Sequence, residues 1–424
     1  MGLQRCRYSC IRMRKSVLYL LVCCAILGVA ACGQRGASSP AEDAPELLAA
    51  VPSDALSVGI FSRLDKGLGH MLDSSSLLHR PDYGRLARSK AVVALCDVGS
   101  LTPLVIVEAG RHGSDTSAAA AALLRQAPEL GLSAELIELP QHNAVAVSPS
   151  PTVISIVRRH IVSESSILDA PCFDMVLEHL GGTDVVACRN SGALKLFDVE
   201  LATFTRREAA SFLKEACEWT VFSGEKMTPV FPSSEKYYCN FMSSVADGQS
   251  KLGSVLPSGV QLALDFPVAS IQEWRRGYET WLDARVKLEQ YNKRLSDLAK
   301  KTGKNPLNWE KEIGVREVAV LAAPGYRVNM IRVNKSVSRD GTVRANPYTG
   351  FAAALYGDAF NAADSCILYC GDWMLSGERQ VLDTLNLGHG KPSGWPSRAR
   401  AAVYTPGRRL YWTNQSIRIW NVNQ

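Results

Sequence analysis

The stretch Val51-Pro52-Ser53-Asp54-Ala55-Leu56-Ser57-Val58 recurs, with changes, as Leu256-Pro257-Ser258-Gly259-Val260-Gln261-Leu262-Ala263. In each copy a Pro-Ser turn leads into a segment whose apolar residues occupy alternate positions, which is typical of a β-strand. Because the two copies lie about 200 residues apart, they predict a chain built from two related modules.

Further matches extend this repeat along both halves of the chain. They pair Ala91–Leu95 with Glu317–Leu321, Leu104–Val107 with Met330–Val333, and Ala146–Ser148 with Met374–Ser376. A glycine lies between the first two strands of each copy, which indicates a tight reversal. Strands joined by tight turns pair antiparallel, so the sequence predicts an α+β fold. We expect mainly antiparallel sheets flanked by helices, not a doubly wound parallel sheet.

The second copy carries about 21 extra residues in its first half. Residues 271–301 account for them, because apolar side chains recur there at steps of three and four, from Trp274 to Leu298. This spacing predicts one long amphipathic helix, ended by Gly303 and Pro306. Its aromatic residues are more typical of a packed core than of a ligand platform.

The N-terminal segment has the parts of a secretory signal. Basic residues and no acidic ones precede the apolar run 18–31, which is too short for an ordinary membrane-spanning helix. Val29-Ala30-Ala31-Cys32 resembles the bacterial lipobox, in which the cysteine is lipidated (palmitate among the acyl chains) and becomes the mature N-terminus. The alternatives are an uncleaved membrane anchor and a plain signal peptide cut at Ala31.

The residues after Cys32 are small, polar and interrupted by proline, which is the composition of a flexible tether. Acyl chains on Cys32 would hold the protein firmly at a membrane. Gly33 stands where inner-membrane lipoproteins commonly carry aspartate, so we expect an outer-membrane anchor facing the periplasm. The predicted parts are therefore a signal peptide 1–31, a tether 32–46, a first α+β module 47–200, a connecting helix and strands 201–251, and a second module 252–424.

The net charge gives no support for nucleic-acid binding. The formal net charge is +6, but five positive charges and no negative ones precede Cys32, which leaves +1 for the mature chain. A nearly neutral body lacks the basic excess that binds a phosphate backbone. We therefore expect the membrane, through the lipid, and an envelope protein or glycan as partners, and no nucleic acid.

The chain resembles a family of uncharacterised bacterial cell-envelope lipoproteins, described as a domain of unknown function. Members carry repeated Leu-Pro-Ala/Ser-Asp openings followed by strands and helices. The resemblance rests on Val51–Ala55, on Leu256-Pro257-Ser258 and on Trp309–Val318, and it covers most of residues 47–388. Gly259 departs from the aspartate of that motif. The resemblance implies no activity, cofactor or catalytic residue.

No residue set in the sequence predicts a catalytic, cofactor or metal site. The chain has no Gly-x-Ser-x-Gly turn, and Gly303-Lys304 and Gly390-Lys391 lack the Ser or Thr of a phosphate loop. Cys366 and Cys370 face the same way on a predicted strand but lie about 13 Å apart, too far to share a zinc ion. The odd number of cysteines after Cys32 leaves at least one thiol unpaired, and we expect buried structural thiols.

One stretch is biased in composition. From Lys391 to Gln424 aromatic residues are interleaved with basic ones, and there is no acidic residue. We take as a candidate interaction patch Arg398, Arg400, Arg408, Arg409, Trp412 and Trp420. Such a surface suits an anionic glycan, lipid headgroups or an acidic protein. The other interpretation, which we favour, is a pair of terminal strands reversing at Pro406-Gly407, with one buried and one solvated face.

The sequence therefore favours a lipid-anchored envelope protein with a non-catalytic binding or scaffolding role. A solute-binding lipoprotein of a transporter is the first alternative, although such proteins usually build their cleft from parallel strand-helix units. A periplasmic hydrolase with His, Asp and Ser gathered only by the fold is the second.

Overall fold

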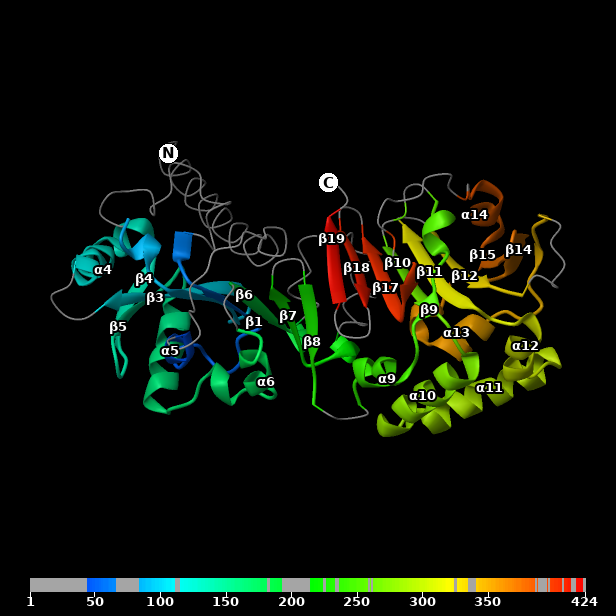
Figure 1. The fold of residues 1–424 in the computed structure, drawn as a ribbon, viewed down its shortest axis with the longest axis horizontal. Coiled ribbons are helices and arrows are strands. Elements are labelled where there is room, and N and C mark those ends of the chain that lie inside the picture. The colour runs from blue at the N-terminus through cyan, green and yellow to red at the C-terminus, as the bar shows by residue number, and fades with distance from the viewer. Residues whose placement is uncertain are drawn as a thin grey trace, which may run out of the picture. The chain divides into compact units, whose positions relative to one another are not determined.

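The structure, a computed structural model, describes residues 44–65, 84–110, 115–180, 184–192, 214–223, 226–232, 236–257, 260, 262–323, 326–334, 341–385, 387, 395, 397–405, 408–412 and 417–421. The described residues form two compact units (Figure 1). Unit 1 holds residues up to 192 together with 218–230, and unit 2 holds 214–217 and the residues from 231 onward.

Unit 1 is built on one antiparallel sheet. Its strands are β1 (Ser57–Phe61), β2 (Ala91–Asp97), β3 (Leu101–Gly110), β4 (Ser133–Glu138), β5 (Asn143–Ser148), β6 (Val185–Arg189), β7 (Trp219–Ser223) and β8 (Lys226–Val230). They pair in the order β4-β5-β3-β2-β1-β6-β7-β8, and every neighbour is antiparallel.

Unit 2 repeats this topology. Its main strands are β10 (Leu262–Pro267), β11 (Glu317–Ala323), β12 (Tyr326–Arg332), β14 (Cys366–Cys370), β15 (Trp373–Gly377), β17 (Ala401–Thr405), β18 (Arg408–Trp412) and β19 (Ile417–Asn421). They pair in the order β14-β15-β12-β11-β10-β17-β18-β19, again antiparallel throughout. Taken in chain order, this is the strand order of unit 1. The predicted α+β class is confirmed, and the two modules share one fold.

Two short strand pairs are additions to unit 2. β13 (Arg344–Ala345) pairs with the outer edge of β14, and β16 (Arg398–Ala399) pairs with β9 (Gly248–Gln249). The second pair brings the chain before β17 back to the chain before β10.

The α-helices in the described part of unit 1 are α2 (Ala44–Leu48), α4 (Asp115–Gln126), α5 (Pro151–Val162) and α6 (Phe173–Leu177). α5 follows β5 and leads to the parallel strand β6, a crossover that fixes which face the helix covers. Its buried side chains pack with those of α2 and α6 over one sheet face, where Val58, Ala94 and Ile106 lie. We call this the α5 face.

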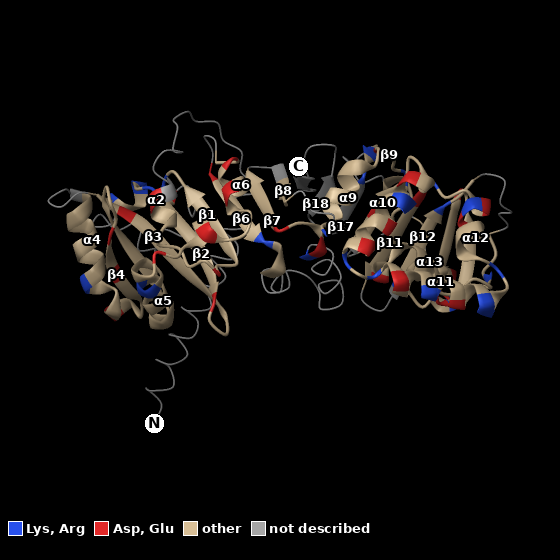
Figure 2. Ribbon diagram, turned by 90° about the horizontal axis from the view of Figure 1, so that it is seen from below, with Lys and Arg blue, Asp and Glu red and all other residues tan. Residues whose placement is uncertain are grey.

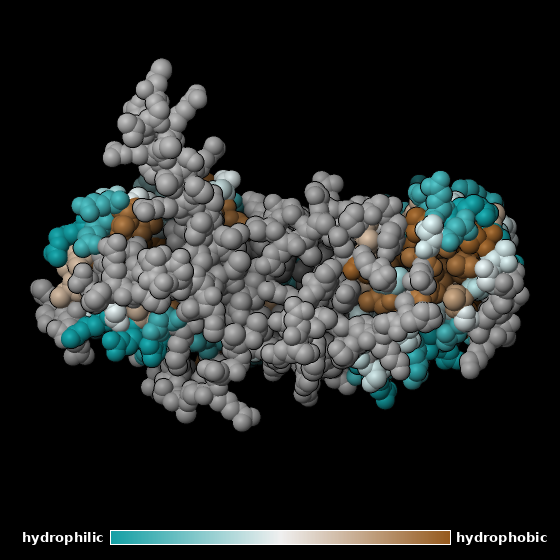
Figure 3. All heavy atoms as spheres, turned by 90° about the horizontal axis from the view of Figure 1, so that it is seen from above, coloured by the Kyte–Doolittle hydropathy of each residue, from teal (hydrophilic) through white to brown (hydrophobic). Residues whose placement is uncertain are grey.

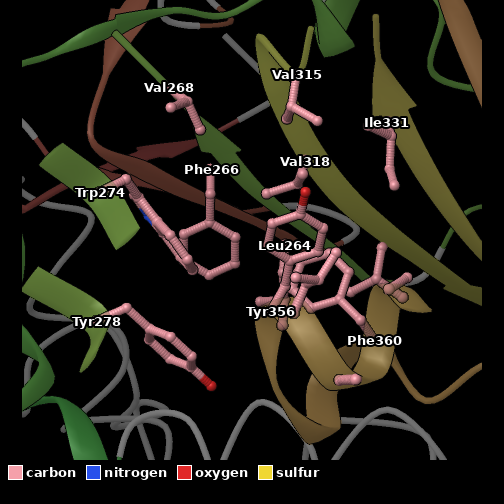
Figure 4. Close-up of a cluster of buried hydrophobic side chains, with 14 of the residues drawn as sticks. Leu264, Phe266, Val268, Trp274, Tyr278, Val315, Val318, Ile331, Tyr356 and Phe360 are labelled. Atoms are coloured by element: carbon pink, nitrogen blue, oxygen red, sulfur yellow. The ribbon is translucent and has the colours of Figure 1, made fainter. Parts of the chain in front are cut away.

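Unit 2 carries α9 (Tyr238–Ser244), α10 (Ile271–Ala284), α11 (Leu288–Thr302), α12 (Pro306–Ile313), α13 (Phe351–Tyr356) and α14 (Arg379–Thr384). α9 to α13 contribute aromatic side chains to a core against Leu264, Phe266 and Val318 (Figure 4). The opposite face packs against α14 through Leu382 and contains Ala263 and Leu321. α14 follows the fifth strand as α5 does, so we call this the α14 face.

The predicted helix 271–301 is divided. α10 ends at Ala284 and α11 begins at Leu288, and Val286 between them has φ 57° and a side chain 93% exposed. A β-branched residue in this left-handed conformation breaks the helical hydrogen bonding. The hydrophobic spacing continues across the break, which is why the sequence alone did not show it.

Two boundaries differ from the predicted ones. The segment 201–251 was expected to connect the modules, but β7 and β8 within it complete the sheet of unit 1 beside β6. The last part of this segment, where a helix followed by strands was expected, instead contains helix α9 (Tyr238–Ser244). α2 begins at Ala44, inside the predicted tether 32–46, because Leu47 and Leu48 are buried in the core of unit 1.

The sequence alignment of the copies is also shifted in places. Val58 lies opposite Ala94, and its counterpart Ala263 lies opposite Leu321. Ala94 therefore corresponds to Leu321, one residue beyond the sequence match with Val320. Ala146 likewise corresponds to Leu375, not to Met374. Both faces of these strands are buried, so apolar pattern alone does not fix the register, although a one-residue slip exchanges the faces.

The predicted signal peptide 1–31 and Cys32 lie outside the described residues. Among the residues that are described, no helix is long and apolar enough to cross a membrane.

Candidate functional site

Buried charged residues are rare in the strands whose burial is described, and Figure 2 shows few blue or red segments in the strands that it does not draw in grey. The buried charged group with the most hydrogen bonds in a strand lies on the α14 face of unit 2. There Ser250, Asp265, Glu317, Arg332 and Trp395 form what we call the acid cluster. Asp265 and Glu317 are both fully buried, on neighbouring strands β10 and β11.

The Ser250 hydroxyl and a hydrogen bond between the two carboxyl groups link Asp265 and Glu317. Ser250 Oγ lies 2.7 Å from Asp265 Oδ2 and 3.1 Å from Glu317 Oε1, and it accepts a hydrogen bond from Trp395 Nε1 at 2.8 Å. Burial and the charge of Glu317 raise the pKa of Asp265 well above its ordinary value. Burial also raises the pKa of Glu317, against the opposing effect of backbone donors and Arg332. Asp265 is therefore the acid of the pair that keeps its proton, and its carboxyl O–H donates a hydrogen bond to the charged Glu317.

Glu317 has a complete set of donors. The backbone N–H groups of Lys251 and Leu252 donate to its carboxylate at 2.9 and 3.0 Å, and Arg332 Nε lies 2.8 Å from Oε2. The other end of Arg332 donates to Gln249 O at 2.7 Å. A buried charge needs such partners to be tolerated. The cluster thus ties the chain 249–252 to the sheet.

Trp395 covers the cluster because Gly253 leaves room for it. A Cβ built on Gly253 would overlap the Trp395 ring and its Cβ. The indole is partly buried, with its N–H directed at Ser250. This cover limits access of water to the two acids. We therefore assign the acid cluster a structural role and no catalytic step.

Unit 1 has different chemistry at the same register. Ile60 stands where Asp265 does, opposite Val92 as Asp265 is opposite Ala319. Lys90, whose carbonyl accepts from the N–H of Glu108, occupies the register position of Glu317. The acid cluster is thus particular to unit 2.

The candidate patch lies beside this cluster in the same sheet. Asp265 is opposite Ala402, which is opposite Tyr411, which is opposite Arg418. The neighbouring row runs from Ala263 through Tyr404 and Arg409 to Trp420. We call these two rows the basic-aromatic rows. Strand alternation places them on the α14 face.

The register divides the predicted patch. Arg409 and Trp420 belong to a basic-aromatic row. Arg408 and Trp412 are an odd number of residues away from Arg409 on β18, so they belong to the opposite face of the sheet. Leu410 lies between them on that face. The side chains of these four residues lie outside the described part of the structure. β17 and β18 pair antiparallel, as expected for terminal strands, and Pro406-Gly407 lie outside the described residues.

Arg398 and Arg400 are placed elsewhere. Arg398 is exposed on the short strand β16, and Arg400 is partly buried with Nε 3.3 Å from Asp247 Oδ1. Burial lowers the pKa of Arg400, against the effect of Asp247. The structure therefore does not gather all six predicted residues on one surface.

A second buried ion pair holds the helices of unit 2 together. Arg275 on α10 pairs with Glu310 on α12 and donates to Tyr291 Oη at 2.9 Å. Its guanidinium lies 5.1 Å from the Trp274 ring centroid. Burial alone would lower the pKa of Arg275, but the charge of Glu310 raises it. The two terminal nitrogens of Arg275 have acceptors within the core, Leu355 O and Tyr291 Oη for one and Glu310 for the other, so the pair serves packing. The predicted use of the aromatic stripe as core is confirmed.

A small hollow lies where β10 leads into α10. Its lining includes Pro267, Ser270, Glu273, Trp274 and Arg400. Its volume of about 10 Å³ has room for about one water molecule, far less than a ligand pocket needs. The charges of Glu273 and Arg400 are of opposite sign, so the hollow selects neither anions nor cations.

The thiols and acids of the described residues form no metal site. No group of three His, Cys, Asp or Glu in this part of the chain could hold an ion. Cys366 and Cys370 lie on strand β14 as predicted, the first buried and the second exposed. Comparisons with protein-family models, with curated proteins and with solved structures gave no match.

Sequence reasoning missed Asp265 and Glu317. The available signal was a lone carboxylate inside each apolar strand, in Leu262-Ala263-Leu264-Asp265-Phe266 and in Glu317-Val318-Ala319-Val320. Asp265 and Glu317 come together through the pairing register of β10 and β11. The alignment of the two copies was wrong by one residue in β11, so it did not reveal this register.

Proposed function

We propose that this protein is a lipid-anchored envelope protein whose second module binds a carboxylate-bearing glycan, with no catalytic step. The observation that supports this best is the register of β17, β18 and β19. It aligns Tyr404, Arg409 and Trp420 in one row, and Tyr411 beside Arg418 in the next.

The composition of these rows suits an anionic sugar chain. Arginine pairs with carboxylates through two parallel hydrogen bonds, and flat aromatic rings pack on the apolar faces of sugar rings. A sheet presents such residues at the regular spacing of its strands, which matches an extended polymer. No acidic residue occurs from Lys391 to Gln424 to compete for the arginines.

The corresponding row of unit 1 differs. Ala187, Val221 and Thr228 occupy these register positions, and Ala187 and Val221 are buried in the core that α6 covers. A covered apolar row has no means of recognising an anion. Binding is therefore assigned to unit 2. Along the chain, unit 1 lies between the lipidated N-terminus and unit 2.

The experiment is co-sedimentation of the detergent-solubilised full chain with cell-wall sacculi, which are glycan sheets bearing carboxylates. We expect binding that weakens with salt and is lost when the sacculus carboxylates are blocked as amides. Equal binding to blocked and unblocked sacculi would contradict the proposal. So would binding to anionic lipid vesicles alone, or to acidic envelope proteins alone.

The lipid anchor has a separate test. Labelling cells with a radioactive fatty acid should label the chain, and Cys32→Ser should abolish the label. Labelling that persists in C32S would contradict lipidation at Cys32.

A further inference from the structure

Two buried thiols of unit 2 lie against each other. Cys217 and Cys239 share a side-chain hydrogen bond, and their exposed fractions are 2% and 0%. Both belong to the core formed by α9 to α13 and the sheet. Most other thiols of the described chain lie on separate strands: Cys96 on β2, Cys188 on β6, and Cys366 and Cys370 on β14.

The position of this pair in the chain indicates what a bond between the two thiols would hold together. Immediately after Cys217 the chain leaves unit 2, forms the hairpin β7–β8 in the sheet of unit 1, and returns at Phe231. Cys239 follows on α9. The two thiols therefore sit at the exit and the return of the segment that unit 2's chain contributes to unit 1.

We propose that Cys217 and Cys239 form a disulfide bond in the mature protein, fastening the base of the β7–β8 segment within unit 2. The inference rests on the proposed envelope location, because that compartment is oxidising and allows disulfides to persist. A bond here would close a loop of about 20 residues, which restricts the unfolded chain and stabilises the fold.

The chemistry requires a disulfide donor, here an oxidised dithiol protein of the envelope. The Cys217 thiolate attacks the donor disulfide, which forms a mixed disulfide and releases one donor thiolate. The Cys239 thiolate then attacks the Cys217 sulfur and releases the second donor thiol. Two electrons and two protons pass to the donor. Burial raises the pKa of Cys239 well above its ordinary value, so both attacks belong to folding, before the core closes.

The test is thiol trapping on the full chain produced in the envelope of a bacterial host. The protein is precipitated with acid, denatured, alkylated without reduction and digested with trypsin. Cys217 and Cys239 fall in separate peptides, 215–226 and 237–251, each with one cysteine. We expect these two peptides to be joined and to lack both thiol hydrogens, while Cys366 is alkylated.

Variants and a second arm make the outcomes decisive. Cys217→Ser should leave Cys239 alkylated, whereas the matched control Cys366→Ser should keep the joined peptides. The reduced full chain is also refolded with oxidised glutathione. Joined peptides after refolding but not from cells would support the disulfide and contradict the envelope location. Alkylation of both cysteines in both arms, or linkage of either to another cysteine, would overturn the inference.

Discussion

The two units share one strand order but differ in what their sheets carry at matching positions. In unit 1 the centre of the α5 face is apolar, with Ile60 beside Val92. In unit 2 the same register holds Asp265 beside Ala319, with Glu317 one step along. The α14 face of unit 2 also ends in the basic-aromatic rows. The comparison shows that the topology tolerates an apolar face and a polar one, so the topology alone does not carry the function.

The units also differ in the connection between their first two strands. In unit 2 it forms α10, α11 and α12, which supply an aromatic core around Trp274 and Tyr278 with a buried ion pair between Arg275 and Glu310. Figure 3 shows apolar and hydrophilic surface side by side on this unit. One face of the unit 2 sheet is therefore occupied by its own helices along β10 and β11.

The largest expected effect is the loss of Glu317. Glu317→Ala leaves Arg332 without its partner and removes the acceptor of two backbone N–H groups. We expect a loss of about 3–5 kcal/mol in the free energy of unfolding. Urea unfolding of the full chain measures it. Lys90→Ala changes the same register position of unit 1 and should cost no more than about 1 kcal/mol. Equal losses of unfolding free energy in Glu317→Ala and Lys90→Ala would contradict the difference drawn between the two units.

The next effect concerns the Cys217–Cys239 bond proposed above. Reduction should lower the free energy of unfolding by about 3 kcal/mol, as expected for a loop of about 20 residues. The measurement is urea unfolding with and without a reductant. The double variant Cys217→Ser/Cys239→Ser should not respond to the reductant. A reductant effect that persists in this variant would place the stabilising bond elsewhere.

A smaller effect distinguishes Asp265 by its pH dependence. The raised pKa means that folded Asp265 keeps its proton at pH values where the unfolded chain, with a pKa of about 4, has lost it. The folded state therefore binds more protons, and stability falls as pH rises above about 4, by up to about 1.4 kcal/mol per pH unit. Asp265→Asn keeps a donor toward Glu317 and should remove this slope.

The measurement is urea unfolding at pH 5 and at pH 7. Between pH 5 and pH 7, the free energy of unfolding of Asp265→Asn should rise by at least about 1 kcal/mol relative to that of the wild type. Asp297→Asn, on the exposed side of α11, is the matched control and should follow the wild type. Parallel slopes for the wild type and Asp265→Asn would mean that Asp265 is ionised in the folded protein.

Much of this fold could be predicted from the sequence. The repeat at Val51 and Leu256 predicted two modules of the same kind, because turn residues and alternating apolar positions are local signals. The division of the helix at Val286 was missed, because hydrophobic spacing continues through it. The acid cluster was missed because Asp265, Glu317 and Ser250 are brought together by strand register and by the strand pair β9–β16, which local patterns do not contain.

The candidate patch was predicted in part. The basic and aromatic bias of the C-terminal stretch identified Arg409 and Trp420, but composition cannot assign residues to faces. The register separates them from Arg408 and Trp412 and adds Tyr404, Tyr411 and Arg418. Arg400 pairs with Asp247, a contact across about 150 residues that no spacing rule would suggest.

The central claim is that unit 2 recognises a carboxylate-bearing glycan through one row of its sheet. The most direct test gives this row the residues that unit 1 carries, with the double variant Arg409→Val/Trp420→Thr, and measures the affinity for sacculi by co-sedimentation. Arg408→Val on the opposite face is the control. We predict that the double variant binds at least about tenfold more weakly and that the control binds as the wild type. Unchanged affinity in the double variant, or an equal loss in the control, would contradict the account.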